Sequence, residues 1–287
     1  MANIYWYLIP AIIGVGAAAF TIYKQRDIAK LSTFLVFYLF ATCIAWLGEF
    51  TVLGFFNSYA YKTGIYASPW AQNILGHLIL NSTFYPGTAI LVAAYSLGYG
   101  WISLITAIYL LFDYLFLKLG IYEHHWWRYY MTGLAIFIYQ IFTKVWFTKL
   151  NKLQPGLLRI STFYFVGFVI LHYPIPIILL LGKQYYNVNW FQDMYLSSTM
   201  FIFTYQLVET LILVFFVCVL KKWFWKLVPF IVAFMGQLIL ANLHILVFQD
   251  GWNLFYTVMV YFSGITIFIL IERYSLKVFC TSFANNK

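Results

Sequence analysis

The chain has 287 residues, of which 64% are hydrophobic and only 9% are charged, and its mean hydropathy is +0.83. A water-soluble domain carries about 25% charged residues, so this composition excludes one and predicts that the chain is dissolved in lipid. The net charge of +9 is spread along the chain in small groups, and we therefore expect no nucleic-acid partner.

Apolar stretches of about 20 residues, the length that crosses the hydrocarbon core of a bilayer, follow one another along the whole chain. They cover residues 3–23, 31–56, 70–97, 101–122, 131–149, 160–182, 195–220, 227–249 and 254–272. The sequence therefore predicts an all-α, polytopic transmembrane helical bundle of about nine spans. No tract is left for a soluble domain, so residues 1–287 form a single membrane domain.

Basic residues gather after the first, fifth, seventh and ninth spans. These groups are Lys24, Arg26 and Lys30; Lys149, Lys152 and Arg159; Lys221, Lys222 and Lys226; Arg273 and Lys277. The other connections contain only Lys62, Lys118, Arg128 and Lys183. Because Lys and Arg are enriched on the cytoplasmic side of membrane proteins, this pattern predicts an N-terminus outside and a C-terminus in the cytoplasm.

Similar segments recur in the two halves of the chain. Residues 31–34 match 160–163, residues 122–126 align with 248–252, and Gly133, Ile136, Phe137 and Ile138 recur as Gly264, Ile267, Phe268 and Ile269. We interpret these matches as a duplication of a four-span unit, with repeat A at 31–150 and repeat B at 160–279. Both copies enter from the same side because four is even, so the repeat is parallel. Residues 1–30 are an extra span and 280–287 a cytoplasmic tail.

Prolines inside the spans predict irregular helices, because proline removes a backbone donor and clashes with the preceding turn. Pro86 lies in the third span, and Pro174 and Pro176 lie in the sixth. We favour a packing kink at these positions over a functional hinge.

Charged and histidine side chains concentrate in the predicted outer half of the membrane. Glu49, Asp113 and Glu209 lie well inside spans, where a charge costs at least about 2.5–3.5 kcal/mol unless it faces protein or water. The candidate residues for a polar cavity or ion pathway are Glu49, His77, Asp113, Lys118, Glu123, His124, His125, His172, Glu209 and His244. We predict a cavity that opens to the outside and has its floor near Asp113 and Glu209. The alternative is that these groups only form hydrogen bonds between helices.

Residues 121–127 read Ile-Tyr-Glu-His-His-Trp-Trp and hold the densest set of ionisable groups. The aromatic residues fit the belt that forms at a membrane interface, but this belt does not explain three adjacent ionisable side chains. Adjacent histidines on a helix point about 100° apart, so we assign no metal site to them. No nucleotide-binding, metalloprotease or serine-hydrolase motif is present in the sequence, and we predict no catalytic residue and no cofactor.

A kinked span with Phe84-Tyr85-Pro86, a helix with Asp113, and an outer turn with residues 120–127 and Tyr130 follow one another. This order resembles a family of small, uncharacterised multi-pass membrane proteins common in endospore-forming Gram-positive bacteria. The resemblance covers 31–150 best and 160–279 only through the repeat, where Gln249, Asp250 and Gly251 replace Glu123, His124 and His125. It implies a bacterial plasma membrane and this architecture, but no activity.

Three functions are compatible with these observations. The first is a pathway for protons, cations or a small solute, which the buried carboxylates, the duplication and the kinked spans favour. The second is a non-catalytic envelope subunit that binds lipid, a partner protein or a second copy of itself, which the absence of a defined motif favours. The third is a membrane-embedded lipid-modifying enzyme that uses histidine and carboxylate as acid and base. We favour the first function.

Overall fold

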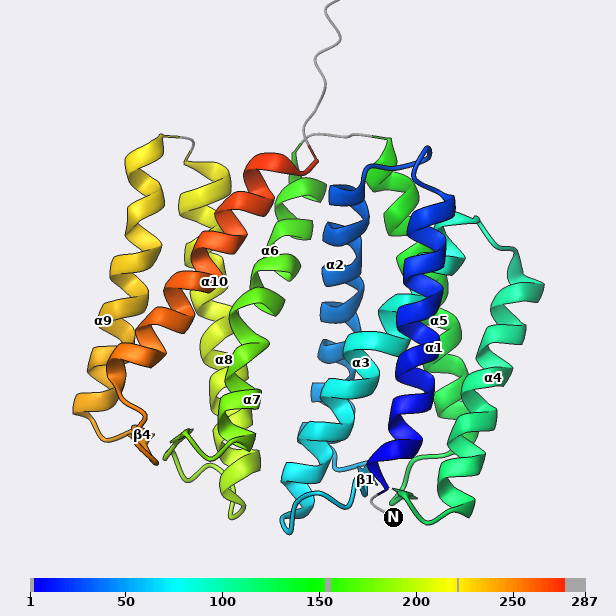
Figure 1. Ribbon diagram of the computed structural model, residues 1–287, viewed down its shortest axis with the longest axis horizontal. Helices are drawn as coiled ribbons and strands as arrows, with labels where there is room; N and C mark the ends of the chain where they lie inside the picture. Colours follow the sequence, from blue (N-terminus) through cyan, green and yellow to red (C-terminus); the bar gives the residue numbers. More distant parts are fainter. Residues whose placement is uncertain (1–2, 153–155, 221, 277–287) are drawn as a thin grey trace, which may run out of the picture.

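The computed structural model describes residues 3–152, 156–220 and 222–276. Long helices packed side by side make up almost all of this part of the chain (Figure 1). The α-helices are α1 (Ile4–Lys24), α2 (Leu31–Glu49), α3 (Pro69–Ala94), α4 (Tyr99–Lys118), α5 (Tyr129–Asn151), α6 (Leu157–His172), α7 (Pro174–Leu180), α8 (Met194–Val214), α9 (Val228–Asn242) and α10 (Leu254–Tyr274). A π-helix extends α2 over Phe50–Phe55 and another extends α8 over Phe215–Val219, and a short 3-10 helix, Trp223–Leu227, precedes α9.

Seven helical segments in the described residues are long and apolar enough to cross a membrane. They are Ile4–Lys24, Leu31–Phe55, Tyr99–Lys118, Leu157–Leu180, Met194–Val219, Trp223–Asn242 and Leu254–Tyr274. The all-α bundle predicted from the sequence is therefore confirmed, and the chain is a multi-pass membrane protein. Helices α3 and α5 lie beside these segments but have more polar side chains, and their crossing of the membrane stays a prediction.

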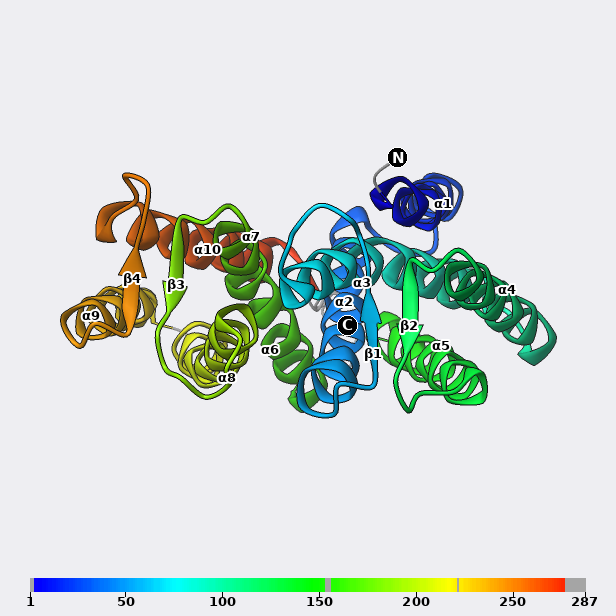
Figure 2. The ribbon, with the colours of Figure 1, turned by 90° about the horizontal axis from the view of Figure 1, so that it is seen from below.

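Four short strands lie at one end of the molecule, which we call the strand end (Figures 1 and 2). Strand β1 (Tyr59–Tyr61) pairs antiparallel with β2 (Tyr122–His124), and β3 (Gln184–Tyr186) pairs antiparallel with β4 (Leu246–Phe248). The sequence analysis included part of β2 and all of β4 in helical spans. The helices end earlier, at Lys118 and Asn242, and Gly120 adopts a positive φ of 67° that stops α4.

Apart from α1, the two halves of the described chain, 31–152 and 156–276, share one order of elements. In each half a strand follows the first long helix and pairs with a strand that precedes the last helix. The second helix of each half is capped by a polar side chain, because Ser68 accepts the amide of Ala71 and Asp193 accepts the amide of Leu196. The Ser68 hydroxyl also donates to Oδ2 of Asp193, 3.2 Å away, and this bond joins the halves at the strand end.

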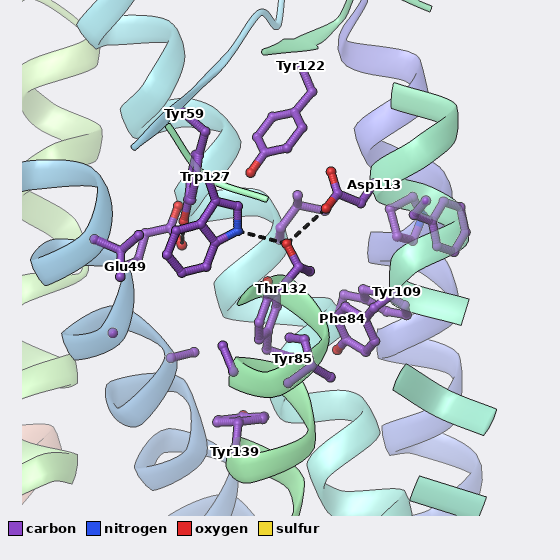
Figure 3. Close-up of a pocket in the computed structure, with 18 of the residues that line it drawn as sticks. Glu49, Tyr59, Phe84, Tyr85, Tyr109, Asp113, Tyr122, Trp127, Thr132 and Tyr139 are labelled. Atoms are coloured by element: carbon purple, nitrogen blue, oxygen red, sulfur yellow. Dashed lines mark hydrogen bonds between the residues drawn. The ribbon is translucent and has the colours of Figure 1, made fainter. Parts of the chain in front are cut away.

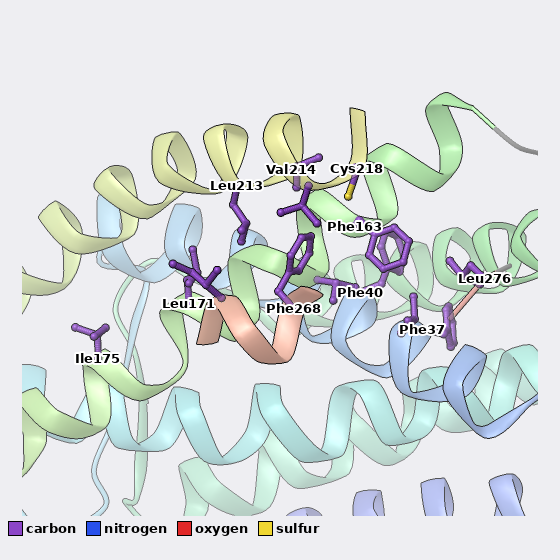
Figure 4. Close-up of a cluster of buried hydrophobic side chains, with 14 of the residues drawn as sticks. Phe37, Phe40, Phe163, Leu171, Ile175, Leu213, Val214, Cys218, Phe268 and Leu276 are labelled. Atoms are coloured by element: carbon purple, nitrogen blue, oxygen red, sulfur yellow. The ribbon is translucent and has the colours of Figure 1, made fainter. Parts of the chain in front are cut away.

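The largest hydrophobic cluster fills the junction between the two halves (Figure 4). Phe37 and Phe40 of α2, Phe163 of α6 and Phe268 of α10 are all fully buried there. Near the strand end, the Phe50 and Phe203 rings stack with centroids 3.5 Å apart and continue this contact. The junction thus holds the two halves of the chain together.

The prolines act differently from one another. The helix breaks at Tyr173, between α6 and α7, directly before Pro174, as the sequence analysis predicted. Helix α3, in contrast, continues through Pro86 without interruption. The residues 280–287, which were predicted to be a cytoplasmic tail, lie outside the described residues.

Candidate functional site

A cavity of about 320 Å³ lies within the first half of the chain, between α2, α3, α4, α5 and the β1–β2 strand pair (Figure 3). Its polar lining consists of two carboxylates, six tyrosines, one tryptophan and one threonine. These residues are Glu49, Asp113, Tyr59, Tyr61, Tyr85, Tyr109, Tyr122, Tyr139, Trp127 and Thr132. We call this space the tyrosine cavity. Among the described residues no Lys or Arg side chain lines it, so its ionisable lining groups are acids and phenols.

Glu49 enters the cavity from the last residue of α2, at the point where the π-helix begins. The hydroxyl of Tyr59 on β1 donates to Oε2 of Glu49 at 2.7 Å. Burial raises the pKa of this Tyr59 hydroxyl, so it remains protonated and able to donate. Oε1 of Glu49 is buried and makes no regular hydrogen bond to the described residues, and the side chains of Tyr61 and Asn81 lie near this carboxylate.

Asp113 enters the cavity from α4 and is held by a chain of hydrogen bonds. Thr132 of α5 donates to Oδ2 of Asp113 at 2.9 Å, and the indole of Trp127 donates to the Thr132 oxygen at 2.8 Å (Figure 3). On the other side, Nε2 of His124 lies 3.0 Å from Oδ1 of Asp113. Only 7% of Asp113 is exposed, so these neighbours fix the position of the carboxylate.

The stretch that the sequence analysis emphasised forms a strand and the loop after it, rather than a helical turn. Successive side chains of a strand point to opposite faces, so His124 faces Asp113 while Glu123 and His125 point away. Glu123 instead pairs with Lys62, 2.5 Å away, and this ion pair lowers the pKa of the Glu123 carboxyl. His125 Nδ1 lies 2.7 Å from the carbonyl oxygen of Asn57 and attaches this loop to the end of the π-helix.

Two further histidines from the sequence analysis lie behind the tyrosine cavity. His77 Nδ1 is 2.8 Å from the amide of Asn81, and His172 Nδ1 is 2.7 Å from Oε1 of Gln206. Together with Glu49, both histidines line a small cavity of about 50 Å³ at the junction of the halves. The His172 contact joins α6 to α8 and matches the alternative in which single polar groups join helices, whereas the His77 contact lies within α3.

The remaining candidates do not reach the tyrosine cavity. Lys118 and His244 are exposed near the strand end, and neither lines a cavity that also contains Glu49 or Asp113. Glu209 lies in the second half of the chain and lines a groove between α8 and α9. Asp113 and Glu209 therefore belong to different cavities and do not share one floor.

Sequence reasoning missed the tyrosines, which supply most of the polar groups of the cavity. The chain has 25 tyrosines, and we assigned the aromatic residues near residue 122 to an interfacial belt. Tyr85 on α3 and Tyr139 on α5 lie deeper, among apolar residues, and give no pattern that separates them from packing residues. The one signal available in the sequence was that several tyrosines occur in the same segments as the two buried carboxylates.

The described residues contain no group of three or more His, Cys, Asp or Glu side chains that could hold a metal ion. Comparison with known proteins finds no matching family model, no matching curated protein and no matching solved structure. The site must therefore be interpreted from its own chemistry. That chemistry consists of two fixed carboxylates surrounded by aromatic rings and hydroxyls inside an apolar bundle.

Proposed function

We propose that this membrane protein conducts or carries a small cation, the proton included, and holds it in the tyrosine cavity. The observation that carries the proposal is that Glu49 and Asp113, from two different helices, line one cavity. No Lys or Arg of residues 3–152, 156–220 and 222–276 lines it. A carboxylate in the hydrocarbon region is costly unless a cation, a proton or a hydrogen-bond donor compensates it. A cation between these two groups supplies that compensation.

The aromatic lining supports the same ligand class. The faces of tyrosine rings attract cations, and this attraction strengthens where water is excluded. The cavity volume of about 320 Å³ falls at the small end of the range for ligand sites, about 300–1,000 Å³. It therefore suits a proton with its water, a hydrated metal ion or a small ammonium rather than a large lipid.

The cavity reaches the strand end through Tyr59 and Tyr122, on the two paired strands (Figure 3). The positive-inside rule predicts that this end faces the outside, because the larger basic groups lie at the other end. Nε2 of His124 lies 3.0 Å from Oδ1 of Asp113, on the strand-end side of this carboxylate. From this position His124 can transfer a proton to Asp113 or control the access of a cation to it.

The test is ion flux into liposomes that contain the purified protein. Proton flux under an imposed pH gradient and membrane potential, and then flux of sodium, potassium and methylammonium, are measured for the parent chain. The same fluxes are measured for Asp113→Asn and Glu49→Gln. We expect each substitution to lower the flux at least about tenfold, which corresponds to about 1.4 kcal/mol at the rate-limiting step.

Glu123→Gln serves as the matched control, because it also removes one carboxylate near the strand end but lies outside the cavity. We expect this variant to retain the parent flux. A parent protein that moves none of these ions would contradict the proposal and favour the non-catalytic subunit. Equal losses in all three variants would show that the cavity has no special role.

A further inference from the structure

A second polar feature lies in the other half of the molecule, away from the tyrosine cavity. A groove of about 550 Å³ runs between α8 and α9, and we call it the α8–α9 groove. Its lining is apolar and aromatic apart from the hydroxyls of Thr204 and Tyr205 and the carboxyl group of Glu209. Both carboxyl oxygens of Glu209 are buried, and neither has a hydrogen-bond partner among the described residues.

The Glu209 carboxyl group lies inside a membrane-spanning segment without a partner among the described residues. Glu209 is only 7% exposed, and it lies near the middle of the Met194–Val219 segment, at the depth of the hydrocarbon. Buried polar groups in proteins nearly always have a partner, so an orphaned one indicates a missing proton, water or ligand. In the part of the chain that the structure describes, no Lys, Arg or His lines the groove to compensate the charge.

The two halves make equivalent hydrogen bonds, and these bonds give the register for comparing them. The Tyr61 amide donates to Asn73 at 2.7 Å, and the Tyr186 amide donates to Ser198 at 2.9 Å. The Trp127 indole donates to Thr132 at 2.8 Å, and the Trp252 indole donates to Thr257 at 2.9 Å. Each of these residues in the second half stands 125 positions after its counterpart in the first half.

In this register, the residues that line the groove correspond to the residues of α3 on which α1 packs in the first half. Gly14 of α1 packs directly on the backbone of α3 at Thr83, Phe84 and Gly87. The residues 125 positions later are Val208, Glu209 and Ile212, and all three line the α8–α9 groove. Figure 2 shows α1 beside α3 and α4, whereas no described helix stands at the corresponding place beside α8 and α9.

The groove is therefore open on the lipid-facing side of the bundle. Val208 is 58% exposed, Ile231 is 60% exposed and Ile239 is 51% exposed, although all three are apolar. In the first half, the position of Glu209 is taken by Phe84, which α1 covers. At this position, which the described helices leave uncovered, the second half thus has a carboxylate where the first half has an aromatic ring.

We propose that the α8–α9 groove binds a lipophilic cation from the membrane, such as a bulky ammonium or phosphonium. The apolar body of the ligand lies among Ile231, Met235 and Ile239, and its positive centre is paired by the Glu209 carboxylate. The rings of Trp190, Phe201 and Tyr205 flank the groove and add cation–π attraction. This site is separate from the tyrosine cavity and does not depend on the proposed cation pathway.

The experiment measures equilibrium binding of tetraphenylphosphonium to the full chain purified in detergent. Tetraphenylborate, which has the same shape and the opposite charge, is the matched ligand control. We expect saturable binding of the phosphonium to the parent chain and at least about a tenfold weaker affinity in Glu209→Gln. We expect Asp113→Asn to bind as the parent does, because Asp113 lines the other cavity.

A second pair of variants tests the groove without touching the carboxylate. Met235→Trp fills the groove, whereas Leu211→Trp adds the same bulk at an exposed position of α8 outside it. We expect loss of binding only in Met235→Trp. Absence of phosphonium binding to the parent, equal binding of the borate, or unchanged affinity in Glu209→Gln would overturn the proposal. Loss in Asp113→Asn alone would place the ligand in the tyrosine cavity and also overturn it.

Discussion

At the scale of single residues, the ionisable groups of β2 act in two separate ways. His124 contacts the buried Asp113, whereas Glu123 forms an ion pair with Lys62 at the surface, where the two side chains are 50% and 46% exposed. Exposed ion pairs of this kind contribute about 0–1 kcal/mol to folding. Of the adjacent ionisable residues 123–125, His124 thus contacts a carboxylate of the cavity, whereas the ion pair of Glu123 contributes little to folding stability.

The Lys62–Glu123 pair gives a prediction for pH. Because Lys62 lowers the pKa of Glu123, the pair stabilises the folded state above the ordinary carboxyl value of about 4.3. This contribution is lost as the pH falls through the lower folded-state pKa. Thermal unfolding in detergent should therefore show Glu123→Gln slightly less stable than the parent at about pH 7, and this difference should shrink as the pH falls below about 4. A difference that grows in acid would contradict this assignment.

How much the sequence reveals differs between these residues. The sequence identified Glu49 and Asp113 as exceptional because charges are costly inside apolar spans, and the structure brings both to one cavity. It could not identify their tyrosine partners, since a buried tyrosine and a packing tyrosine look alike in an apolar chain. Nor could it separate Glu209 from Asp113, because helices that are apolar on nearly all sides do not reveal which way a residue faces.

At the scale of elements, α1 is attached to α3 by close backbone contact. A methyl group added at Gly14 would overlap the backbone of α3, and one added at Gly87 would overlap the backbone of α1. Small residues that let two helices approach in this way are a common basis of helix association in membranes. The α1–α3 contact therefore depends on these two glycines.

Replacing Gly14 by valine tests this contact. The added side chain forces α1 away from α3. We expect the variant to lose about 1–3 kcal/mol of folding stability and therefore to unfold at a lower temperature. Gly16→Val is the matched control, because a side chain at Gly16 on the same helix meets no atom within 4 Å. Thermal unfolding in detergent measures both variants. Similar losses in the two would mean that helix propensity, and not the α1–α3 contact, sets the effect.

Helix positions were largely predictable, whereas the strands were not. Long apolar stretches and polar caps define the helix ends, and Pro174 marks the break between α6 and α7 because it cannot continue the hydrogen-bond ladder. The three-residue strands β1 and β2 pair across 60 residues of chain and lack an alternating pattern long enough to detect. The sequence analysis therefore assigned part of β2 to a helix.

At the scale of the whole molecule, we infer that the two halves arose by duplication. The equivalent hydrogen bonds and strand pairs support this inference. The hydrogen-bonded residues and strands β1 and β3 are related by 125 positions, and strands β2 and β4 by 124 positions. None of the three matches used in the sequence analysis has a spacing of 125, because they are 129, 126 and 131 positions apart; Gly133, for example, aligns with Val258 and not with Gly264. In an apolar chain, short matches of glycine and isoleucine arise too easily to fix a register.

The orientation of the molecule in the membrane can be predicted from its two ends. Most of the described basic residues lie at the end opposite the strands. They are Lys24, Arg26 and Lys30; Lys149, Lys152 and Arg159; and Lys222 and Lys226. The positive-inside rule then predicts a cytoplasmic location for this end and an outside location for the strand end. The same orientation directs the opening of the tyrosine cavity to the outside.

Cysteine labelling in intact bacterial cells measures this orientation. With the native cysteines Cys43, Cys218 and Cys280 replaced by serine or alanine, single cysteines are introduced as Glu123→Cys at the strand end and Lys152→Cys at the basic end. A membrane-impermeant maleimide should label the first variant in intact cells and the second only after the membrane is opened. The reverse result would place the cavity opening in the cytoplasm, and a cation held between Glu49 and Asp113 would then enter from inside the cell.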